Sequence, residues 1–364
     1  MCGINLKKLG LVIKIPRSKR FLLLDIILIS LFLVSCDKMT DIEKAENLVN
    51  QGYDYLNKYE YDKAIKIGKK LKKLRHSSAF EIMALAYKAK GKSKKSIKIL
   101  EEGVSLAPKV WLLWQLLGNF YSDDKRYLDS QKCYEMALSC PNVDESSVYY
   151  NSSMAYFREG KFNEALKQHD KINYREPDNE FSLHSQSHKI DILIKLNKYE
   201  EAVELAQKLI KKEWKGEYEN ILEALSYAYA SLSEGLWKLK REEEALNSAW
   251  KAIELNKHQK KAAWLIREIE GKISDNAKHF NIRIKGIWST PMVGETDRPG
   301  FFTTYAVIAE TEEEAFKLIK RFEPKEVRDT IKVEEINIIK DHIKGPIGVY
   351  NTSGYIFFPQ NDNV

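Results

Sequence analysis

The spacing of apolar residues divides the chain into three stretches. Residues from Phe21 to Val34 are almost continuously apolar. Residues 42–273 carry apolar side chains at helical spacing, with a period near 3.6. Beyond Ile273 the apolar residues alternate with polar ones, which is the period of a half-buried strand. We therefore expect an apolar leader, a long helical region and a final region that contains a sheet.

The leader has the organisation of an export signal. Basic residues come first, and the apolar run that follows is shorter than the roughly 20 residues needed to cross a bilayer. The run ends in Leu33-Val34-Ser35-Cys36, which resembles a bacterial lipobox. The basic residues are Lys7, Lys8, Lys14, Arg17, Lys19 and Arg20.

The lipobox resemblance predicts where the protein resides. It implies that residues 1–35 are a cleaved signal peptide, that Cys36 carries acyl chains such as palmitate, and that residues 36–41 are a short lipidated linker. The chain would then sit on a bacterial cell membrane and face the periplasm or the exterior. Asp37 resembles a signal for retention at the inner membrane. An uncleaved anchor helix is the alternative.

A tyrosine recurs in the helical region at spacings of 32, 34 and 35 residues. A small residue stands three positions before each tyrosine and another nine positions after it, and such residues let helix backbones approach closely. The tyrosines are Tyr55, Tyr87, Tyr121 and Tyr156, and the small residues are Gly52, Ala84, Gly118 and Ser153 before them and Ala64, Ser96, Ser130 and Ala165 after them.

This pattern resembles the tetratricopeptide repeat, most clearly in Trp114–Asn142 and Ser153–Asn179. In that family each repeat is a pair of antiparallel helices, and repeats stack because one pair cannot bury its apolar face alone. Two less regular units follow, with first helices expected near Ser187–Asn197 and Ile221–Leu239 and a closing helix over His258–Ile273. The resemblance implies an all-α superhelix of about six repeats over residues 42–273.

The resemblance also implies a binding groove. In this family the first helices of the repeats line a concave groove that holds an extended peptide or a partner protein. A single aromatic residue at such a position can instead belong to the packing between helices. The groove-facing positions carried onto this chain are Tyr53, Gln115, Asn119, Tyr150, Phe157, Tyr227 and Trp237, with Glu81 and Asp191 beside them.

Residues 274–364 predict a small α+β domain. Strands are expected over 279–290, 300–311 and 330–340, and Thr311 with Glu314 forms a capping box that opens a helix over 312–322. One helix over a sheet is enough to bury a core of this size. The last segment, "IGVYNTSGYIFFP", predicts a hairpin that turns at Asn351–Gly354.

Charge narrows the choice of partners. Without the leader the chain holds 53 basic and 51 acidic residues, and this near-neutral balance argues against a nucleic-acid partner. The segment Lys63–Lys98 is different, because it holds 13 Lys and Arg residues and one acid, Glu81. Such a block near a lipidated end suggests contact with anionic headgroups. A solvated lysine face is the alternative.

Motifs for catalysis are weak. Gly91-Lys92-Ser93 lacks the earlier glycine that a phosphate loop requires, since Ala86 occupies that place. His184 and His188 have a metal-like spacing, with His169 as the nearest further histidine, but the pattern of a zinc protease is missing. We therefore predict no catalytic residues, no cofactor and no metal site.

These features favour a membrane-anchored adaptor of the bacterial envelope that binds a partner protein or peptide in the repeat groove. Two alternatives remain: an immunity-type inhibitor, and an enzyme whose site lies in the C-terminal domain.

Overall fold

A computed structural model describes residues 42–174, 176–291, 298–339 and 345–359. The predicted signal peptide, Cys36 and the linker lie outside these residues. The chain divides into two compact units between Asp144 and Glu145, and each is described by itself.

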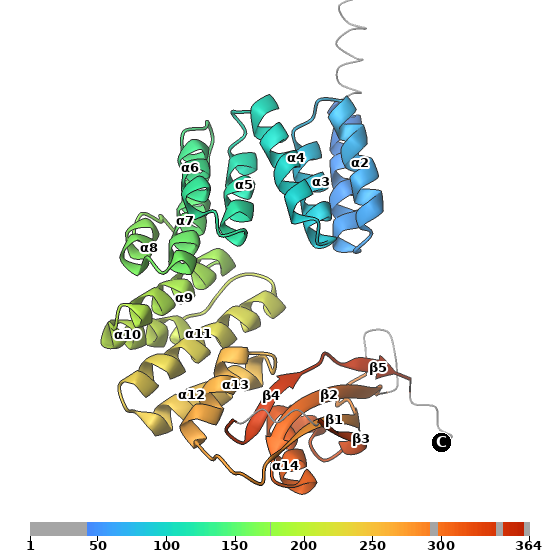
Figure 1. Cartoon of the computed structure of the whole chain (residues 1–364), viewed down its shortest axis with the longest axis vertical. Coiled ribbons are helices and arrows are strands. Elements are labelled where there is room, and N and C mark those ends of the chain that lie inside the picture. The colour runs from blue at the N-terminus through green and yellow to red at the C-terminus, as the bar shows by residue number, and fades with distance from the viewer. Residues whose placement is uncertain (1–41, 175, 292–297, 340–344, 360–364) are drawn as a thin grey trace, which may run out of the picture. The chain divides into compact units, whose positions relative to one another are not determined.

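The first unit is a series of helices (Figure 1). A helix over residues 42–57 precedes five further helices, and the apolar side of each packs on its neighbours. The bounds are α2 Tyr61–Lys73, α3 Ser78–Ala89, α4 Ser93–Leu106, α5 Trp111–Asp123 and α6 Tyr127–Leu138.

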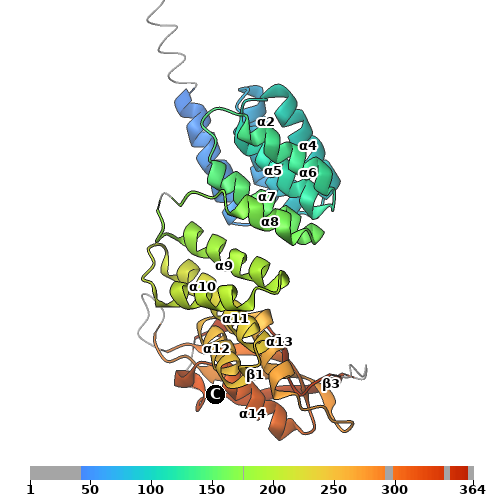
Figure 2. The same ribbon diagram turned by 90° about the vertical axis from the view of Figure 1, so that its left-hand side faces the viewer.

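The second unit continues with helices of the same kind and then adds a sheet (Figure 2). The helix α9 begins at Glu180, seven residues before the expected start, because Asn179 caps it by accepting a hydrogen bond from the Ser182 amide. The bounds are α7 Glu145–Glu159, α8 Phe162–His169, α9 Glu180–Lys195, α10 Tyr199–Lys211, α11 Tyr218–Lys238, α12 Glu242–Leu255 and α13 Lys260–Glu270.

The turn between the two helices of each pair contains one residue in the left-handed backbone region. This residue stands two positions before the start of the second helix, and glycine fills the place in only two of the pairs. The described residues thus contain six helical pairs and the closing helix α13, which confirms the repeat architecture. The left-handed residues are Tyr59, Gly91, Lys125, Gly160, Asn197 and Lys240.

Small residues bring the paired helices together, as the repeat pattern predicts. A methyl group added to Gly118 would lie 2.7 Å from the Tyr134 ring. The Ser130 hydroxyl donates to the Gly118 carbonyl over 2.8 Å, and the Ser153 hydroxyl donates to the Ala165 carbonyl over 2.8 Å. The small side chains therefore bring the backbones close and also satisfy a backbone acceptor.

The C-terminal domain is a five-stranded antiparallel sheet with one helix of its own, α14 Glu312–Phe322. The Thr311 hydroxyl accepts from the Glu314 amide, which confirms the predicted cap. The strands follow the order β3-β1-β2-β4, with β5 also paired to β2, and their bounds are β1 Lys278–Ile287, β2 Gly300–Ala309, β3 Lys332–Ile339, β4 Gly348–Thr352 and β5 Ile356–Phe358.

The expected hairpin at Asn351–Gly354 is wrong. Strands β4 and β5 do not pair with each other, because both pair with β2, one after the other along the same edge. The segment between them keeps the chain on that edge, since the Ser353 amide donates to the Thr304 carbonyl and the Thr303 hydroxyl donates to the Ser353 carbonyl. The turn-like sequence is an interruption in one long edge strand.

The sheet shares its core with the last repeats. One face carries Phe280, Ile282 and Tyr305, and these pack in one cluster with residues of α12, α13 and α14. In both ribbon views α12 and α13 lie against the C-terminal domain (Figures 1 and 2). The sheet therefore packs on α13 as well as on α14, where we expected α14 alone. The helix α12 joins the same core through the contact of Trp250 with Phe322.

Candidate functional site: the first-helix face and a polar cavity

In the first unit the predicted groove residues make polar contacts between helices. Tyr53 shares a hydrogen bond with Glu81, and burial followed by this contact raises the pKa of Tyr53. The Asn119 carbonyl oxygen accepts from the Tyr134 hydroxyl over 2.7 Å. Gln115 is buried on α5. These contacts hold the side chains in place, and their role in partner binding stays a prediction.

In the second unit the predicted aromatic residues gather around α9. The rings of Tyr150 and Phe157, from α7, meet the His188 ring edge to face at centroid distances of 5.8 and 5.1 Å. All three aromatic groups are buried or half-buried. Two of the predicted residues thus form one cluster with a histidine that sequence reasoning assigned to a metal-like spacing.

Tyr227 and Asp191 belong to a buried charge network beside that cluster. The Tyr227 hydroxyl donates to Asp191, and Lys261 lies 2.6 Å from Asp191 and 3.3 Å from Glu234. Burial alone would raise the pKa of Asp191, but Lys261 and the hydrogen bonds from Tyr227 and Ser231 hold it below its ordinary value. The network joins α9, α11 and α13. We call Tyr150, Phe157, His188, Asp191 and Tyr227 together the first-helix face.

Trp237 lies apart from this group. Its ring meets the Trp264 ring edge to face at 5.6 Å, and it packs against the core that the last repeats share with the sheet. Trp264 is 37% exposed. Trp237 is therefore partly a packing residue. This is the alternative to a groove position that we considered for each aromatic residue.

The two buried histidines serve the packing of the second unit. The Nε2 of His169 donates to the Ser185 carbonyl over 2.8 Å, and the ring centroid of His169 lies 6.4 Å from that of His188. Burial lowers the pKa of each to about 4. Within the described ranges, no three His, Cys, Asp or Glu side chains gather as they would around a metal ion.

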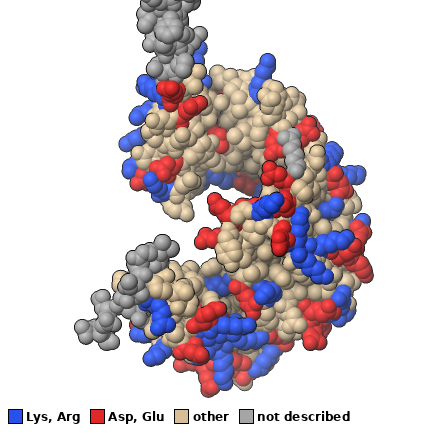
Figure 3. All heavy atoms as spheres, turned by 180° about the vertical axis from the view of Figure 1, so that it is seen from behind, with Lys and Arg blue, Asp and Glu red and all other residues tan. Residues whose placement is uncertain are grey.

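The basic block Lys63–Lys98 is partly neutralised by acids just outside it. Lys72 of α2 lies 2.6 Å from Glu102 of α4, and Lys90 lies 2.6 Å from Asp62. Two more of its lysines pair with Glu60 and Asp123. Counting along the sequence therefore overstates the local charge. Elsewhere on the surface, Lys and Arg also stand beside Asp and Glu (Figure 3).

A cavity of about 520 Å³ opens between the ends of two helices in the second unit. Its walls come from the last turn of α12, the turn that leads into α13, the end of α14 with the 3-10 helix Lys325–Val327, and Tyr355. Sequence reasoning did not find this site, because it forms only when the sheet packs on the last repeats.

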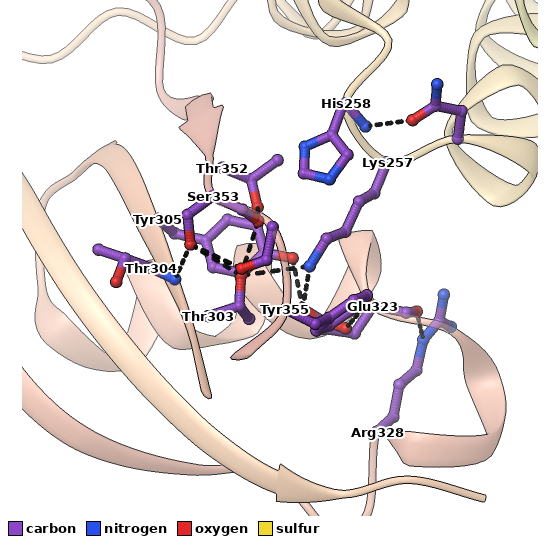
Figure 4. Close-up of polar contacts among 12 residues, drawn as sticks. Lys257, His258, Thr303, Thr304, Tyr305, Glu323, Arg328, Thr352, Ser353 and Tyr355 are labelled. Carbon is purple, nitrogen blue, oxygen red and sulfur yellow. Dashed lines mark hydrogen bonds and ion pairs between the residues drawn. The ribbon is translucent and has the colours of Figure 1, made fainter. Parts of the chain in front are cut away.

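A buried ion pair, Lys257 with Glu323, lines the cavity. Figure 4 shows the polar contacts of this pair. Lys257 lies 3.3 Å from Glu323, and their side chains are 6% and 0% exposed. Glu323 also accepts from the hydroxyls of Tyr305 and Tyr355, each over 2.5 Å. The Lys257 ammonium lies 3.3 Å from the centre of the Tyr355 ring. Burial lowers the pKa of Lys257 to about 8, against the opposing effect of Glu323.

No helix in the described part of the chain is both long and apolar enough to cross a bilayer.

Comparison with known proteins supports the repeat. Residues 77–110, which hold α3 and α4, match the tetratricopeptide repeat model. The chain therefore carries a repeat of this kind, where the sequence pattern predicted one. No curated protein matches the chain.

Several solved structures have a similar fold. PilF of Pseudomonas aeruginosa is 12% identical, with 64% of this chain and 98% of that chain covered and a TM-score of 0.49. RapI in its apo form is 16% identical, with 62% and 71% covered and a TM-score of 0.47. The Cut9–Hcn1 hetero-tetramer of the APC/C is 14% identical, with a TM-score of 0.47. The match covers 60% of this chain and 41% of that one.

Proposed function

We propose that this protein is a membrane-tethered scaffold of the bacterial envelope, and that its first-helix face holds an extended segment of a partner protein. The observation that carries the proposal is the set of half-buried rings that contact α9: Tyr150 and Phe157 from α7 through His188, and Tyr227 from α11 through Asp191. Aromatic rings of this kind offer apolar contact area together with a hydroxyl group.

The contacts of these rings suit a binding surface. Tyr150 and Phe157 are fixed by His188, and Tyr227 is fixed by Asp191. A surface that is already ordered loses little side-chain entropy when a partner binds. An extended peptide would place its apolar side chains against the rings and its backbone groups near the polar network.

Tethering rests on the leader and on the first repeats. Cys36 would carry the acyl chains, and more than one chain is needed for stable anchoring. Lys66, Lys69 and Lys73 are exposed on α2. Close to an anionic membrane each such cation adds about 1 kcal/mol of attraction. The first unit would then lie near headgroups, and the inner membrane is favoured by Asp37.

The alternative of an enzyme in the C-terminal domain meets an obstacle in the cavity. Its buried carboxylate, Glu323, already accepts hydrogen bonds from Lys257, Tyr305 and Tyr355. These three donors occupy the oxygens that a substrate would have to reach. The proposal therefore puts the activity in partner binding.

Photo-crosslinking in living cells tests the scaffold. A photoreactive amino acid replaces Tyr150 or Tyr227 in turn, and exposed Lys208 of α10 and Glu243 of α12 give matched control positions. We expect one and the same partner from the first two positions, at several times the yield of the controls. Equal yields from all four positions would reject a groove-based role.

Metabolic labelling with a palmitate analogue, together with the size of the chain on a gel, tests the tether. The Cys36→Ser variant should lose labelling by a palmitate analogue and should accumulate as the uncleaved precursor. Labelling that persists in this variant would contradict the assignment of Cys36.

A further inference from the structure

The cavity beside Lys257 has the size of a ligand site. Small-molecule sites span roughly 300–1,000 Å³, and this cavity measures about 520 Å³. Part of its wall is apolar, from Ile253, Leu255, Phe322 and Pro324. The Tyr355 ring adds an aromatic surface. Such a wall can hold the uncharged body of a small molecule.

Cations outnumber carboxylates around the cavity. Lys257 and Glu323 neutralise each other in the lining. Four cations and two carboxylates remain: Lys251, Arg321, Lys325 and Arg328 against Glu254 and Glu326. The ends of α12 and α14 each bring about half a negative charge. Arg321 is itself paired with Glu270, which lies outside the lining, over 2.8 Å, so the net charge is near zero. The preference for an anionic ligand therefore rests on Arg328 and Lys325.

Two hydrogen bonds hold the Arg328 guanidinium in place, and they use two of its three nitrogens. Its Nε donates to the Glu323 carbonyl over 2.8 Å and its Nη2 to the Arg321 carbonyl over 3.0 Å. Within the described residues the remaining nitrogen, Nη1, has no hydrogen-bond partner. These two bonds also neutralise part of the negative end of α14. A fixed guanidinium with an unused N–H group is suited to a carboxylate or phosphate.

Lys325 supplies a second, adjustable cation. Its Nζ lies 3.7 Å from Glu254, and its side chain is 74% exposed. An exposed ion pair at this distance contributes little to the stability of the fold. A bound anion can therefore take over the Lys325 ammonium at small cost.

We propose that this cavity binds a small anionic molecule, whose carboxylate or phosphate group contacts Arg328 and Lys325 and whose body lies against Phe322 and Tyr355. This site is independent of the first-helix face. Its ligand would contact both the last helical pair and the C-terminal domain, since both contribute to the walls. The lowered pKa of Lys257 supports a functional site here, because perturbed groups cluster at such sites.

Thermal unfolding of the mature chain tests the proposal. Inorganic phosphate and succinate are the probes, and sodium chloride at matched ionic strength is the reference. A ligand that binds only the folded state raises the midpoint as its concentration passes Kd, and the gain then grows with the logarithm of the concentration. We expect phosphate, succinate or both to raise the unfolding midpoint above that in sodium chloride. The anion that acts identifies the group that the site accepts.

Two variants locate the effect. Arg328→Gln and Lys325→Gln should each weaken binding about tenfold, the usual result of losing one charge-assisted hydrogen bond. Lys208→Gln on α10 removes a cation whose side chain is 70% exposed and lies outside the cavity, so it should leave binding unchanged. If Arg328→Gln does not fold, Lys325→Gln decides, because its exposed side chain is not needed for folding.

If neither anion raised the midpoint above the sodium chloride reference, the proposal would be overturned. An equal shift in the wild type and in Lys325→Gln would overturn it as well, because the anion would then act at another place or on the solvent.

Discussion

The two compact units are built from the same helical pair, yet they bury different groups. The first unit buries mainly apolar side chains, and its ion pairs lie on the surface: the Lys72 and Glu102 side chains are 41% and 44% exposed. The second unit buries Lys257 with Glu323 and Asp191 with Lys261. It also shares one core between its last helices and a sheet.

This difference shows where a repeat fold can take on new roles. Apolar stacking is enough to hold a repeat in an array. Buried charges add little net stability when paired, but they are costly when one partner is removed. Their presence in the second unit joins the helices to the C-terminal domain and makes that unit sensitive to single changes.

The largest effect is expected at the buried ion pair. Lys257→Met leaves the Glu323 carboxylate without its cation in a buried place, which typically costs about 3–5 kcal/mol of unfolding free energy. Equilibrium denaturation in urea, followed by circular dichroism, measures the loss. Lys208→Met on exposed α10 is the control and should change stability little. A loss below about 1 kcal/mol in Lys257→Met would contradict the role of buried charge.

The next effect belongs to the close packing of the first unit. Gly118→Ala puts a methyl group 2.7 Å from the ring of Tyr134, and overpacking of this kind costs about 1–3 kcal/mol. Gly354→Ala is the control, since no atom lies within 4 Å of an added methyl group. Thermal unfolding compares the two variants, and equal midpoints would refute the close helix contact.

A smaller effect is expected from pH. The pKa of His188 is about 4 in the folded chain, because of burial first and then the nearby His169, Lys261 and Arg158, with Asp191 acting in the opposite direction. The ordinary value is 6.5. Between these two values His188 is protonated in the unfolded chain and neutral in the folded chain. The free energy of unfolding therefore falls as the pH drops from 6.5 towards 4.

Comparison with His188→Phe isolates this contribution. Between pH 7 and pH 5 the wild type should lose about 1–2 kcal/mol more than the variant, as linkage predicts for one such group. Urea denaturation at the two pH values gives the difference. Identical losses would mean that His188 is not the buried neutral group described above.

The smallest effect is expected at the surface pair of the first unit. Lys72→Gln removes the partner of Glu102, and a half-exposed pair contributes about 0–1 kcal/mol. Denaturation in low and high salt checks this value, because salt screens whatever attraction exists. A loss as large as that of Lys257→Met would remove the contrast between the two units.

Much of the fold could be predicted from the sequence because repeats depend on local patterns. The tyrosine spacing located the helical pairs, and the hydroxyl of Thr311 located the start of α14. The pairing of β4 and β5 could not be predicted in this way. Asn351–Gly354 carries the usual residues of a turn, and only the distant strand β2 decides that the chain runs on.

The residues of the candidate sites also differ in whether a local sequence pattern reveals them. Tyr150, Phe157 and Tyr227 could be placed on first helices because their repeat positions are local, and their role in binding stays a prediction. Lys257 and Glu323 were missed, since a lysine among other lysines and a glutamate after an apolar helix look solvated. Their burial depends on the packing of the sheet against α12 and α13, which no local pattern reports.

The central claim is that the last repeats and the C-terminal domain form one folded body. Native-state hydrogen exchange tests it most directly, by comparing the opening free energies of amides in α12, β1 and β2. We predict the same value for all three elements, and a common decrease in Lys257→Met. Exchange of the strands at a much lower free energy than α12 would contradict the claim, because the sheet would then open by itself.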